Sequence, residues 1–310
     1  MKIIIAGPGA MGLLLTSLLS KSKEEIWLLD KNKKRTAKIK EKGISVEGLC
    51  GSWKTMVRIT TSPEEIGPAD LIILCVKSYD TKNALANFKP LLGRETMVLS
   101  VQNGLGNLEL IAEVAEENKV IGGVTNLGAT LVEETKVRFA GNGETVIGLL
   151  NGGFPVELRH IRELFNRVGI TTKVSRDIKG VLWSKLLINT GINALTAILQ
   201  LPNGKLVESE GTRRIMRAAV TEATRIAKRK RIKLLYDDPL AKVEAVCEAT
   251  ATNLSSMLQD VLKEKNTEID FINGVIVRLG QELSIPVPTN LLLLDLVKTI
   301  EATYATRARS

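Results

Sequence analysis

The sequence has few of the residues that bind transition metals or form disulfides. Its only histidine is His160, and its three cysteines, Cys50, Cys75 and Cys247, are far apart and form no Cys-x-x-Cys pair. Neither a disulfide framework nor a zinc site follows from them, and a transition-metal site is not expected with so few ligands. This cysteine usage fits a reducing, intracellular compartment, so we expect a cytoplasmic protein without a metal.

Aromatic residues and long apolar runs are equally scarce. Aromatics are 4% of the chain, which leaves little material for a surface that stacks nucleic-acid bases. No run of about 18 apolar residues occurs, and the apolar run at the N-terminus is too short for a signal peptide. The net charge of +9 favours anionic ligands but is not a nucleic-acid footprint by itself. We therefore expect a small-molecule ligand, and neither nucleic acid nor a membrane as partner.

Length and pattern predict two domains. The 310 residues suit two domains, and at 44% hydrophobic they can build a sizeable core. Strand-like and helix-like segments alternate up to residue 174, and only helical patterns follow. The predicted fold class is α/β, with an N-terminal Rossmann-type dinucleotide-binding domain at 1–174 and an all-helical C-terminal domain at 175–310. The helices expected in the second domain span 178–199, 208–232, 237–251, 267–282 and 289–303.

A glycine-rich turn follows the first apolar run, residues 2–6. It reads Gly7-Pro8-Gly9-Ala10-Met11-Gly12, a G-x-G-x-x-G motif between a predicted strand and a predicted helix at 10–19. In such a loop the first glycine makes the tight turn and the second lets the backbone approach a pyrophosphate, while the third lets helix and strand pack closely. These six residues are candidate dinucleotide ligands. The alternative is a tight turn that binds nothing.

The second predicted strand, 26–29, ends at Asp30, where a Rossmann fold selects its cofactor. An acidic residue here usually accepts the ribose 2′-hydroxyl of NAD, whereas a basic residue accommodates the 2′-phosphate of NADP. The chain offers Asp30 and then a basic run from Lys31 to Arg35. The two signals conflict, and the basic run is also typical of a solvated helix start.

Two further buried strands, at 69–76 and 97–101, are followed by polar residues. Lys77 and Asn103 stand at the carboxyl ends of these parallel strands, where open α/β sheets bind their ligands. Antiparallel strands are expected to complete the sheet, at 120–124, 137–139 and 146–149, with turns at 133–135 and 141–143.

One predicted helix carries a polar row. Lys185, Asn189 and Asn193 are each four residues apart in an otherwise apolar segment, so they lie on one face. An unpaired buried amide costs about 1–3 kcal/mol and an unpaired charge costs more, so something polar must meet this row. The row is either a structural hydrogen-bond network between helices or a site in which Lys185 donates a proton and the amides orient a substrate.

Several motifs are spread over nearly the whole chain. They read Gly7-x-Gly9-x-x-Gly12, Val76-Lys77, Gln102-Asn103-Gly104, Trp183-x-Lys185-x-x-x-Asn189-x-x-x-Asn193, Pro202-Asn203-Gly204, Ser255-Ser256-Met257-Leu258-Gln259-Asp260 and Thr267-Glu268-Ile269-Asp270-x-x-Asn273-Gly274. In this order they resemble the ketopantoate reductase (2-dehydropantoate 2-reductase) family. The Lys–Asn–Asn helix and the last two motifs are much more specific than the glycine loop.

The resemblance implies an NADPH-dependent reduction of 2-dehydropantoate to (R)-pantoate, in the pathway to pantothenate and coenzyme A. By this resemblance Lys185 is the catalytic acid and contacts the ketone oxygen. Hydride arriving at the carbonyl carbon leaves negative charge on that oxygen, which a lysine can stabilise and then protonate. The resemblance also assigns substrate orientation to Asn189, Asn193 and Asn203, and the substrate carboxylate to Asn253 and Ser256. Taken alone, Ser256 could equally be a helix cap and Asn203 a turn residue.

The resemblance implies further cofactor contacts besides the glycine loop. Asn103 resembles the residue where nicotinamide ribose and substrate meet, and Glu268 a cofactor contact that would otherwise be read as a surface ion pair. Ala129 resembles a loop residue beside the cofactor, and Lys31 and Lys77 resemble basic cofactor ligands. Asp30 departs from the pattern and leaves NADH as an alternative to NADPH.

Two other classes stay open. A related two-domain reductase for another branched 2-oxo acid would keep Lys185 and Asn189, but it need not keep Asn193, Asn203 and Ser256. A non-catalytic NADP-binding regulator would have no reason to retain a lysine on an apolar helix face. The sequence leaves the oligomeric state open, although helical second domains often supply a dimer surface and a homodimer is one of the alternatives.

Overall fold

The computed structural model describes residues 1–306, which form two compact units. The first contains Met1–Gln102 and Asn107–Ile178, and the second contains Asn103–Gly106 and the chain from Lys179 onward. An α/β unit followed by a helical unit confirms the predicted fold class. The sequence prediction set the boundary at 174 and did not anticipate that the loop 103–106 groups with the helical unit.

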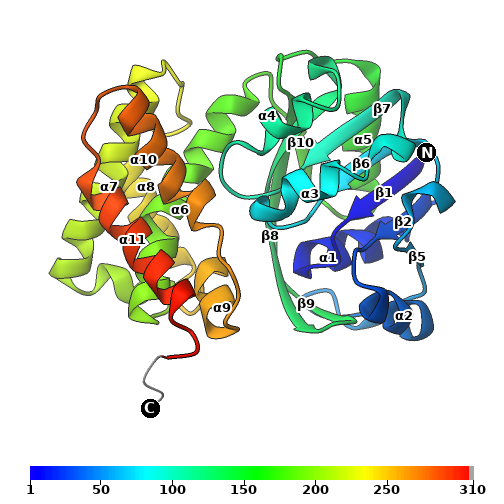
Figure 1. The fold of residues 1–310 in the computed structure, drawn as a ribbon, viewed down its shortest axis with the longest axis horizontal. Coiled ribbons are helices and arrows are strands. Elements are labelled where there is room, and N and C mark those ends of the chain that lie inside the picture. The colour runs from blue at the N-terminus through cyan, green and yellow to red at the C-terminus, as the bar shows by residue number, and fades with distance from the viewer. Residues whose placement is uncertain (307–310) are drawn as a thin grey trace. The chain divides into compact units, whose positions relative to one another are not determined.

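The first unit is built on one ten-stranded sheet (Figure 1). The strand order is β4-β3-β9-β8-β7-β6-β1-β2-β5, and β10 pairs with β9. The central strands are parallel, and β8 and β9 are antiparallel. The strands are β1 (Lys2–Ala6), β2 (Glu25–Leu29), β3 (Ile44–Gly48), β4 (Trp53–Thr55), β5 (Arg58–Thr60), β6 (Ala69–Leu74), β7 (Leu92–Ser100), β8 (Val120–Glu133), β9 (Lys136–Leu149) and β10 (Thr172–Val174).

The centre of this sheet follows directly from its sequence. β1 and β6 are nearly continuous apolar runs, as expected for parallel strands that are covered on both faces. From β1 the chain passes to β2 on one side, forms β3 and β4 at the opposite edge, returns to β5 beside β2 and then reaches β6 on the other side of β1. This makes β1/β6 the point where the strand order reverses, which is where open α/β sheets bind ligands.

Helices pack around the sheet. α1 contacts β1, β2, β3, β8 and β9, and α5 contacts β9 and β10. The helices of this unit are α1 (Ala10–Leu19), α2 (Lys33–Lys42), α3 (Thr81–Leu85), α4 (Asn107–Ala112) and α5 (Val156–Arg167). Four short 3-10 turns lie between them, at Pro63–Glu65 (η1), Ser78–Asp80 (η2), Lys89–Leu91 (η3) and Glu117–Lys119 (η4).

The predicted structure of residues 119–149 was wrong in one respect. The expected turn at 141–143 lies inside β9, so the region forms two strands of 14 residues each. Its glycines mark shifts in register, such as the one between Gly128 and Ala129, where the two backbones approach closely. A glycine in a strand interior can signal a bulge as well as a turn, and here it signals a bulge.

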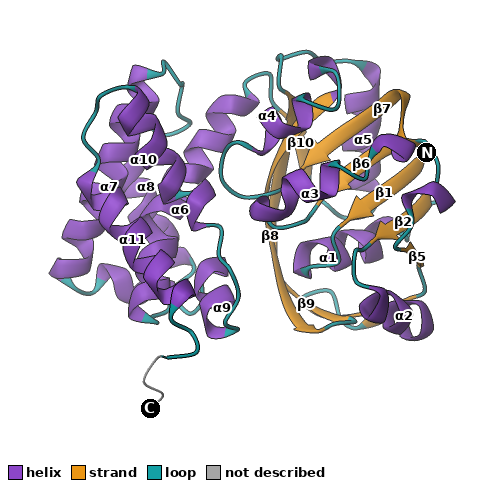
Figure 2. Cartoon of the chain, in the orientation of Figure 1, coloured by secondary structure: helices purple, strands orange, loops and turns teal. Residues whose placement is uncertain are grey.

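The second unit contains helices and no strand within the described residues (Figure 2). Residues 267–282, predicted as one helix, divide at Ile272, whose backbone (φ −109°, ψ −85°) is not helical. The helices are α6 (Ile178–Leu199), α7 (Glu210–Arg229), α8 (Pro239–Ala249), α9 (Ser256–Leu262), α10 (Asn273–Glu282) and α11 (Pro288–Ala302), with 3-10 turns η5 (Asn203–Val207) and η6 (Ile269–Phe271).

α6 is the core helix of this unit. A Cβ on Gly191 would come within 2.9 Å of both Val220 on α7 and Val243 on α8, so the glycine lets three helices approach closely. Among residues 1–306, α6 alone is long and apolar enough to cross a membrane by length and composition. Its apolar window has a mean hydropathy of 1.2 and is 72% buried inside the protein, and the core helix of a soluble protein meets the same criteria.

Candidate active site

The predicted polar row lies on α6. Lys185 and Asn189 are partly buried, and Asn193 is only 5% exposed. Within residues 1–306, neither Asn189 nor Asn193 forms a side-chain hydrogen bond to another residue. A structural network between helices would satisfy these amides with protein partners. Their open hydrogen-bonding capacity instead suits a ligand or water.

The amine of Lys185 has an unusual electrostatic environment. Burial lowers the pKa of Lys185 to about 8, and the negative charge of Glu268 acts against this shift. Glu268 is 5% exposed and accepts a 3.3 Å hydrogen bond from Asn103 Nδ2. The helical unit therefore brings together three residues that the sequence assigned to one site: Lys185, Glu268 and Asn103.

Asn103 is held by the loop that follows it. Leu105 N donates to the Phe271 carbonyl oxygen over 3.1 Å, and Gly104 has φ +81°. A Cβ on Gly104 would lie 2.3 Å from that same oxygen, so only glycine fits. This close approach explains why Gly104 follows Asn103 in the sequence.

A second wall of polar groups is formed by the loops around Asn203 and Asn253. Asn203 N donates to the Asn253 carbonyl oxygen over 3.0 Å, and Gly204 N donates to Ala251 O over 3.1 Å. The Asn203 side chain is 8% exposed, and its Nδ2 donates to Thr250 Oγ1 over 2.9 Å. Its Oδ1 is buried without a hydrogen-bond partner among the described residues. This orphaned acceptor can accept a hydrogen bond from a ligand hydroxyl.

The N-terminus of α9 corrects one reading of the sequence. Ser255 is the N-cap and accepts a hydrogen bond from Leu258 N, so Ser256 is not the cap. Ser255 Oγ also lies 2.7 Å from Thr196 Oγ1 at the end of α6, which joins the two helices. Ser256 and Asn253 are both exposed and available to a ligand. Ser255 belongs to a quoted motif but was given no role, and Thr196 and Thr250 lie outside every motif, so the sequence did not identify these three hydrogen-bonding residues.

The three glycines of the loop in the first unit differ in their surroundings: Gly7 and Gly12 pack against neighbouring atoms, whereas the space beside Gly9 is open. Gly7 has φ +102°, and a Cβ there would lie 2.7 Å from Val76 Cγ1 at the end of β6. A Cβ on Gly12 would lie 1.9 Å from the Gly7 carbonyl oxygen. Gly9, directly before α1, has open space where a Cβ would point. Because the first backbone N–H groups of a helix lack internal partners, this opening can hold a phosphate.

Lys31 and Lys77 follow strands β2 and β6, on either side of β1. Lys31 Nζ donates to Asp80 Oδ1 over 2.8 Å, and its side chain is 74% exposed. Lys77 is partly buried and precedes the 3-10 turn η2. Both therefore lie at the carboxyl edge of the sheet, as predicted for residues that follow parallel strands.

Asp30 already accepts hydrogen bonds from several protein donors. Its carboxylate is buried and accepts hydrogen bonds of 2.7 Å and 2.6 Å from Nε and Nη2 of Arg35. It also accepts bonds from the backbone N–H groups of Lys31 and Asn32. The acidic Asp30 was the sequence signal that favoured NADH. Its negative charge is neutralised by the bidentate ion pair with Arg35.

Ala129 was expected in a loop, and this was wrong. It lies in β8 at the register shift opposite Phe139. It is partly buried and packs against the same core as Ala10 and Met11 of the glycine loop. The loop was implied by the family resemblance, whereas this position is part of a strand with an irregular register.

A buried network that the sequence did not identify supports the end of β6. Gln102 Nε2 donates to Thr81 Oγ1 over 2.7 Å and to the Val76 carbonyl oxygen over 2.9 Å. Thr81 in turn donates to Asn107 Oδ1. These bonds fix the loop that carries Lys77.

Residues 1–306 contain no group of three or more His, Cys, Asp or Glu side chains that could hold a metal ion.

The sheet with its open glycine turn and the helical unit with its polar row define a two-domain nucleotide-binding α/β protein. The chain belongs to the ketopantoate reductase PanE/ApbA family. The family's first model matches residues 3–152, and its C-terminal model matches residues 177–301.

The chain is also similar to individual proteins over nearly its whole length. A 2-dehydropantoate 2-reductase of Pyrococcus horikoshii is 39% identical over 303 residues, which cover 97% of this chain and 98% of the relative. A crystal structure of a PanE/ApbA family ketopantoate reductase from Ralstonia eutropha is 34% identical with a TM-score of 0.90, covering 98% and 99% of the two chains. A D-mandelate dehydrogenase with NADH and anilino(oxo)acetate is 27% identical with a TM-score of 0.91, again over 98% and 99%.

The glycine loop generates a direct test. Gly9→Val should remain folded, because Gly9 has φ −78° and open space around its missing Cβ. The added side chain would fill the space that a pyrophosphate needs, so affinity for NADPH or NADH should fall more than about tenfold. Cofactor affinity by fluorescence titration and melting temperature should be measured on the same preparation.

Gly12→Val is the contrasting variant. Its Cβ would collide with the Gly7 carbonyl oxygen, so this variant should lose stability and not only affinity. Unchanged cofactor affinity in a folded Gly9→Val protein would remove residues 7–12 from the site.

Proposed function

We propose that this protein is an NADPH-dependent reductase that converts the ketone of 2-dehydropantoate to the alcohol of (R)-pantoate. The observation that carries the proposal is the polar row on α6. There a desolvated lysine and two amides, which have no side-chain hydrogen-bond partner among residues 1–306, share one face of a core helix. The nicotinamide cofactor, when bound, supplies the hydride. The residues of this chain bind and orient the substrate and protonate its ketone oxygen.

Lys185 is the proposed general acid. An ammonium at the ketone oxygen stabilises the negative charge that develops there and then transfers its proton to the oxygen. An ordinary lysine holds its proton tightly at neutral pH. Burial lowers the pKa of Lys185 to about 8, so that proton transfer becomes easier, while Glu268 keeps enough of the amine protonated.

The amides and the serine hydroxyl are proposed to orient the substrate. Asn189 and Asn193 lie on the same face as Lys185, and Asn203 offers its orphaned Oδ1 to a hydroxyl donor. 2-Dehydropantoate has such a hydroxyl at the end opposite its carboxylate. Asn253 and Ser256, both exposed, are proposed to hold the carboxylate.

A second candidate is a reductase for another branched 2-oxo acid, favoured by the similarity to a D-mandelate dehydrogenase. A substrate without a hydroxyl would leave Asn203 Oδ1 buried and unpaired, at a cost of about 1–3 kcal/mol. This cost favours the hydroxylated substrate. A non-catalytic regulator is less favoured, because it has no use for a desolvated lysine.

The cofactor is proposed to bind at the carboxyl edge of the sheet. The backbone of Gly7 to Gly12 would hold the pyrophosphate, and Lys31 and Lys77 would supply positive charge. Ala129 would line the same site. Asn103 and Glu268 of the helical unit would contact the nicotinamide ribose, consistent with their hydrogen bond to each other.

NADPH is proposed over NADH because of the state of Asp30. Its carboxylate accepts four protein hydrogen bonds and its charge is paired with Arg35, so little capacity remains for a ribose hydroxyl. Lys31 next to it is exposed and can exchange Asp80 for a phosphate. An exposed ion pair is weak, so this exchange costs little.

The cofactor preference is testable by steady-state kinetics. kcat/KM should be higher with NADPH than with NADH by about 10–100-fold, the size of one or two charged hydrogen bonds. Lys31→Ala should reduce the NADPH value and leave the NADH value nearly unchanged. A clear preference of the wild-type protein for NADH would show that Asp30 governs the ribose.

The proton donor is testable by Lys185→Ala. Turnover should fall by about 10²–10⁴-fold, the usual contribution of general acid catalysis. NADPH binding should survive. The melting temperature should not drop much, because the variant removes a charge from an apolar environment while Glu268 keeps its hydrogen bond from Asn103. Lys179→Ala is the matched control, since Lys179 is an exposed lysine on the same helix.

The pH profile adds a second readout of the same residue. In the direction of ketone reduction, kcat/KM of the wild-type protein should be flat below about pH 8 and fall about tenfold per unit above it, because Lys185 loses its proton there. If Lys185→Ala keeps near-normal turnover per folded molecule, the row on α6 is structural and the proposed mechanism is wrong.

A further inference from the structure

Asn273 belongs to the motif Thr267–Gly274, yet the proposed function gives it no role. It is the first residue of α10 and is fully buried. Its Nδ2 donates to the carbonyl oxygen of Thr190 on α6 over 3.4 Å and to Asn290 Oδ1 on α11 over 3.0 Å. One buried amide therefore joins three helices.

The orientation of Asn290 is imposed by a buried carboxylate. Asn290 Nδ2 donates to Glu222 Oε2 over 2.7 Å and to the Ala219 carbonyl oxygen over 3.0 Å. Because its nitrogen is committed to these two acceptors, its oxygen must face Asn273. Only the nitrogen of Asn273 can then face Asn290, so the orientation of the Asn273 amide is also fixed.

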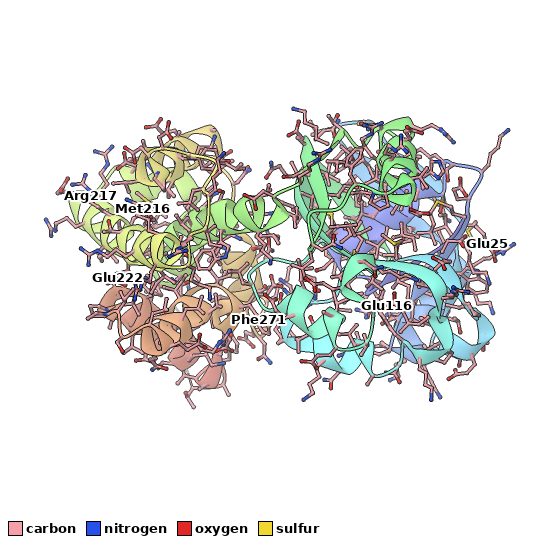
Figure 3. All side chains as sticks on the ribbon, turned by 90° about the horizontal axis from the view of Figure 1, so that it is seen from above. Glu25, Glu116, Met216, Arg217, Glu222 and Phe271 are labelled. Atoms are coloured by element: carbon pink, nitrogen blue, oxygen red, sulfur yellow. The ribbon has the colours of Figure 1, made fainter. Side chains whose placement is uncertain are left out.

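Glu222 is also held in place by the start of α11. It is 6% exposed on α7, whereas Arg217 of the same helix is exposed (Figure 3). Glu222 accepts hydrogen bonds from the backbone N–H groups of Thr289 and Asn290, over 2.9 Å and 3.0 Å. These groups begin α11, which has no side-chain cap of its own, so the carboxylate serves as its cap.

Asn273 lies in the same short segment as Glu268, so the network also bears on the position of Glu268. The segment 267–273 also contains Glu268, whose charge acts on Lys185. Thr267 N and Asp270 tie this segment to α11, through Glu301 and Lys298. Asn273 ties it to α6 instead, at Thr190, five residues after Lys185.

We propose that Asn273, oriented by Asn290 and Glu222, positions the segment that carries Glu268 against the helix that carries Lys185. Asn273 is a positioning residue, since it acts through Glu268 and the argument gives it no contact with substrate or cofactor. The inference rests on the proposed function only in taking Lys185 as the proton donor.

The electrostatic consequence has a definite sign. Glu268 raises the pKa of Lys185 against the effect of burial, so a retreat of Glu268 lowers that pKa further. For charges about 4–7 Å apart at an effective dielectric constant of about 20, each ångström of retreat corresponds to roughly 0.3–0.6 pH unit. A change in packing elsewhere has no reason to move this pKa.

The test is Asn273→Leu, which keeps side-chain size and removes the hydrogen bonds. The pKa of Lys185 is measured by NMR on protein with 13C-labelled lysine, and its signal is assigned by its absence in Lys185→Ala. We expect the Lys185 pKa to fall by about 0.3 unit or more in Asn273→Leu. The alkaline limb of kcat/KM should move down by the same amount. Ile226→Ala, which removes a fully buried side chain from α7 and none of these hydrogen bonds, should lower stability without moving either.

A second variant keeps the test decisive if Asn273→Leu does not fold. Asn290→Ala leaves Asn273 and its bond to Thr190 in place but removes the acceptor that orients it, so a smaller shift in the same direction is expected. An unchanged or raised Lys185 pKa in a folded Asn273→Leu protein, or in Asn290→Ala if only that variant folds, overturns the proposal. The NMR readout does not depend on turnover. If Lys185→Ala keeps its activity while the Asn273 variant shifts this pKa, the proposed function fails and the positioning role stands.

Discussion

The removal of one lysine amine from water is the constraint on which the helical unit depends. Lys185 lies on the core helix α6, and burial lowers its pKa to about 8. A buried charge needs a compensating partner, and Glu268 supplies opposite charge. Glu268 in turn is hydrogen-bonded by Asn103, whose loop is held by the contact of Gly104 with Phe271. Glu268 and Asn103 therefore offset the free-energy cost of keeping the Lys185 ammonium partly buried.

Close backbone contacts at glycine explain much of the remaining geometry. Gly12, Gly104 and Gly204 each lie where a Cβ would overlap a neighbouring atom, at 1.9, 2.3 and 2.6 Å respectively. These three glycines bring pairs of segments together and are structural. Gly9 differs because the space beside it is open. The same residue type thus has two roles in one motif, and only the structure distinguishes the position that faces a ligand from those that face the protein.

The sequence predicted best where a long segment has one strong pattern. The helices at 10–19 and 178–199 were predicted with the bounds that the structure gives, because continuous apolar periodicity leaves no competing interpretation. Prediction from the sequence failed where one local pattern is compatible with two structures. The glycines at 141–143 predicted a turn and form part of a bulge, and the helix expected over 267–282 breaks at the non-helical backbone of Ile272.

The candidate site shows the same limit. The row of Lys185, Asn189 and Asn193 follows from spacing alone, because a helix places positions four apart on one face. The pairing of Asp30 with Arg35 does not, and it changes how the cofactor signal is read. The relay from Glu222 through Asn290 to Asn273 joins residues far apart in the sequence, so no local pattern could have predicted it.

The central claim is that this polar row and Asn203 recognise and reduce a hydroxylated 2-oxo acid. The most direct measurement compares kcat/KM for 2-dehydropantoate with that for 3,3-dimethyl-2-oxobutanoate, which differs only in lacking the terminal hydroxyl. A site built to hydrogen-bond a hydroxyl strongly rejects the analogue without it, so 2-dehydropantoate should be preferred by at least about 10²-fold. Asn203→Leu should reduce this preference. Equal efficiency with the two substrates, or a preference for the analogue, would contradict the account.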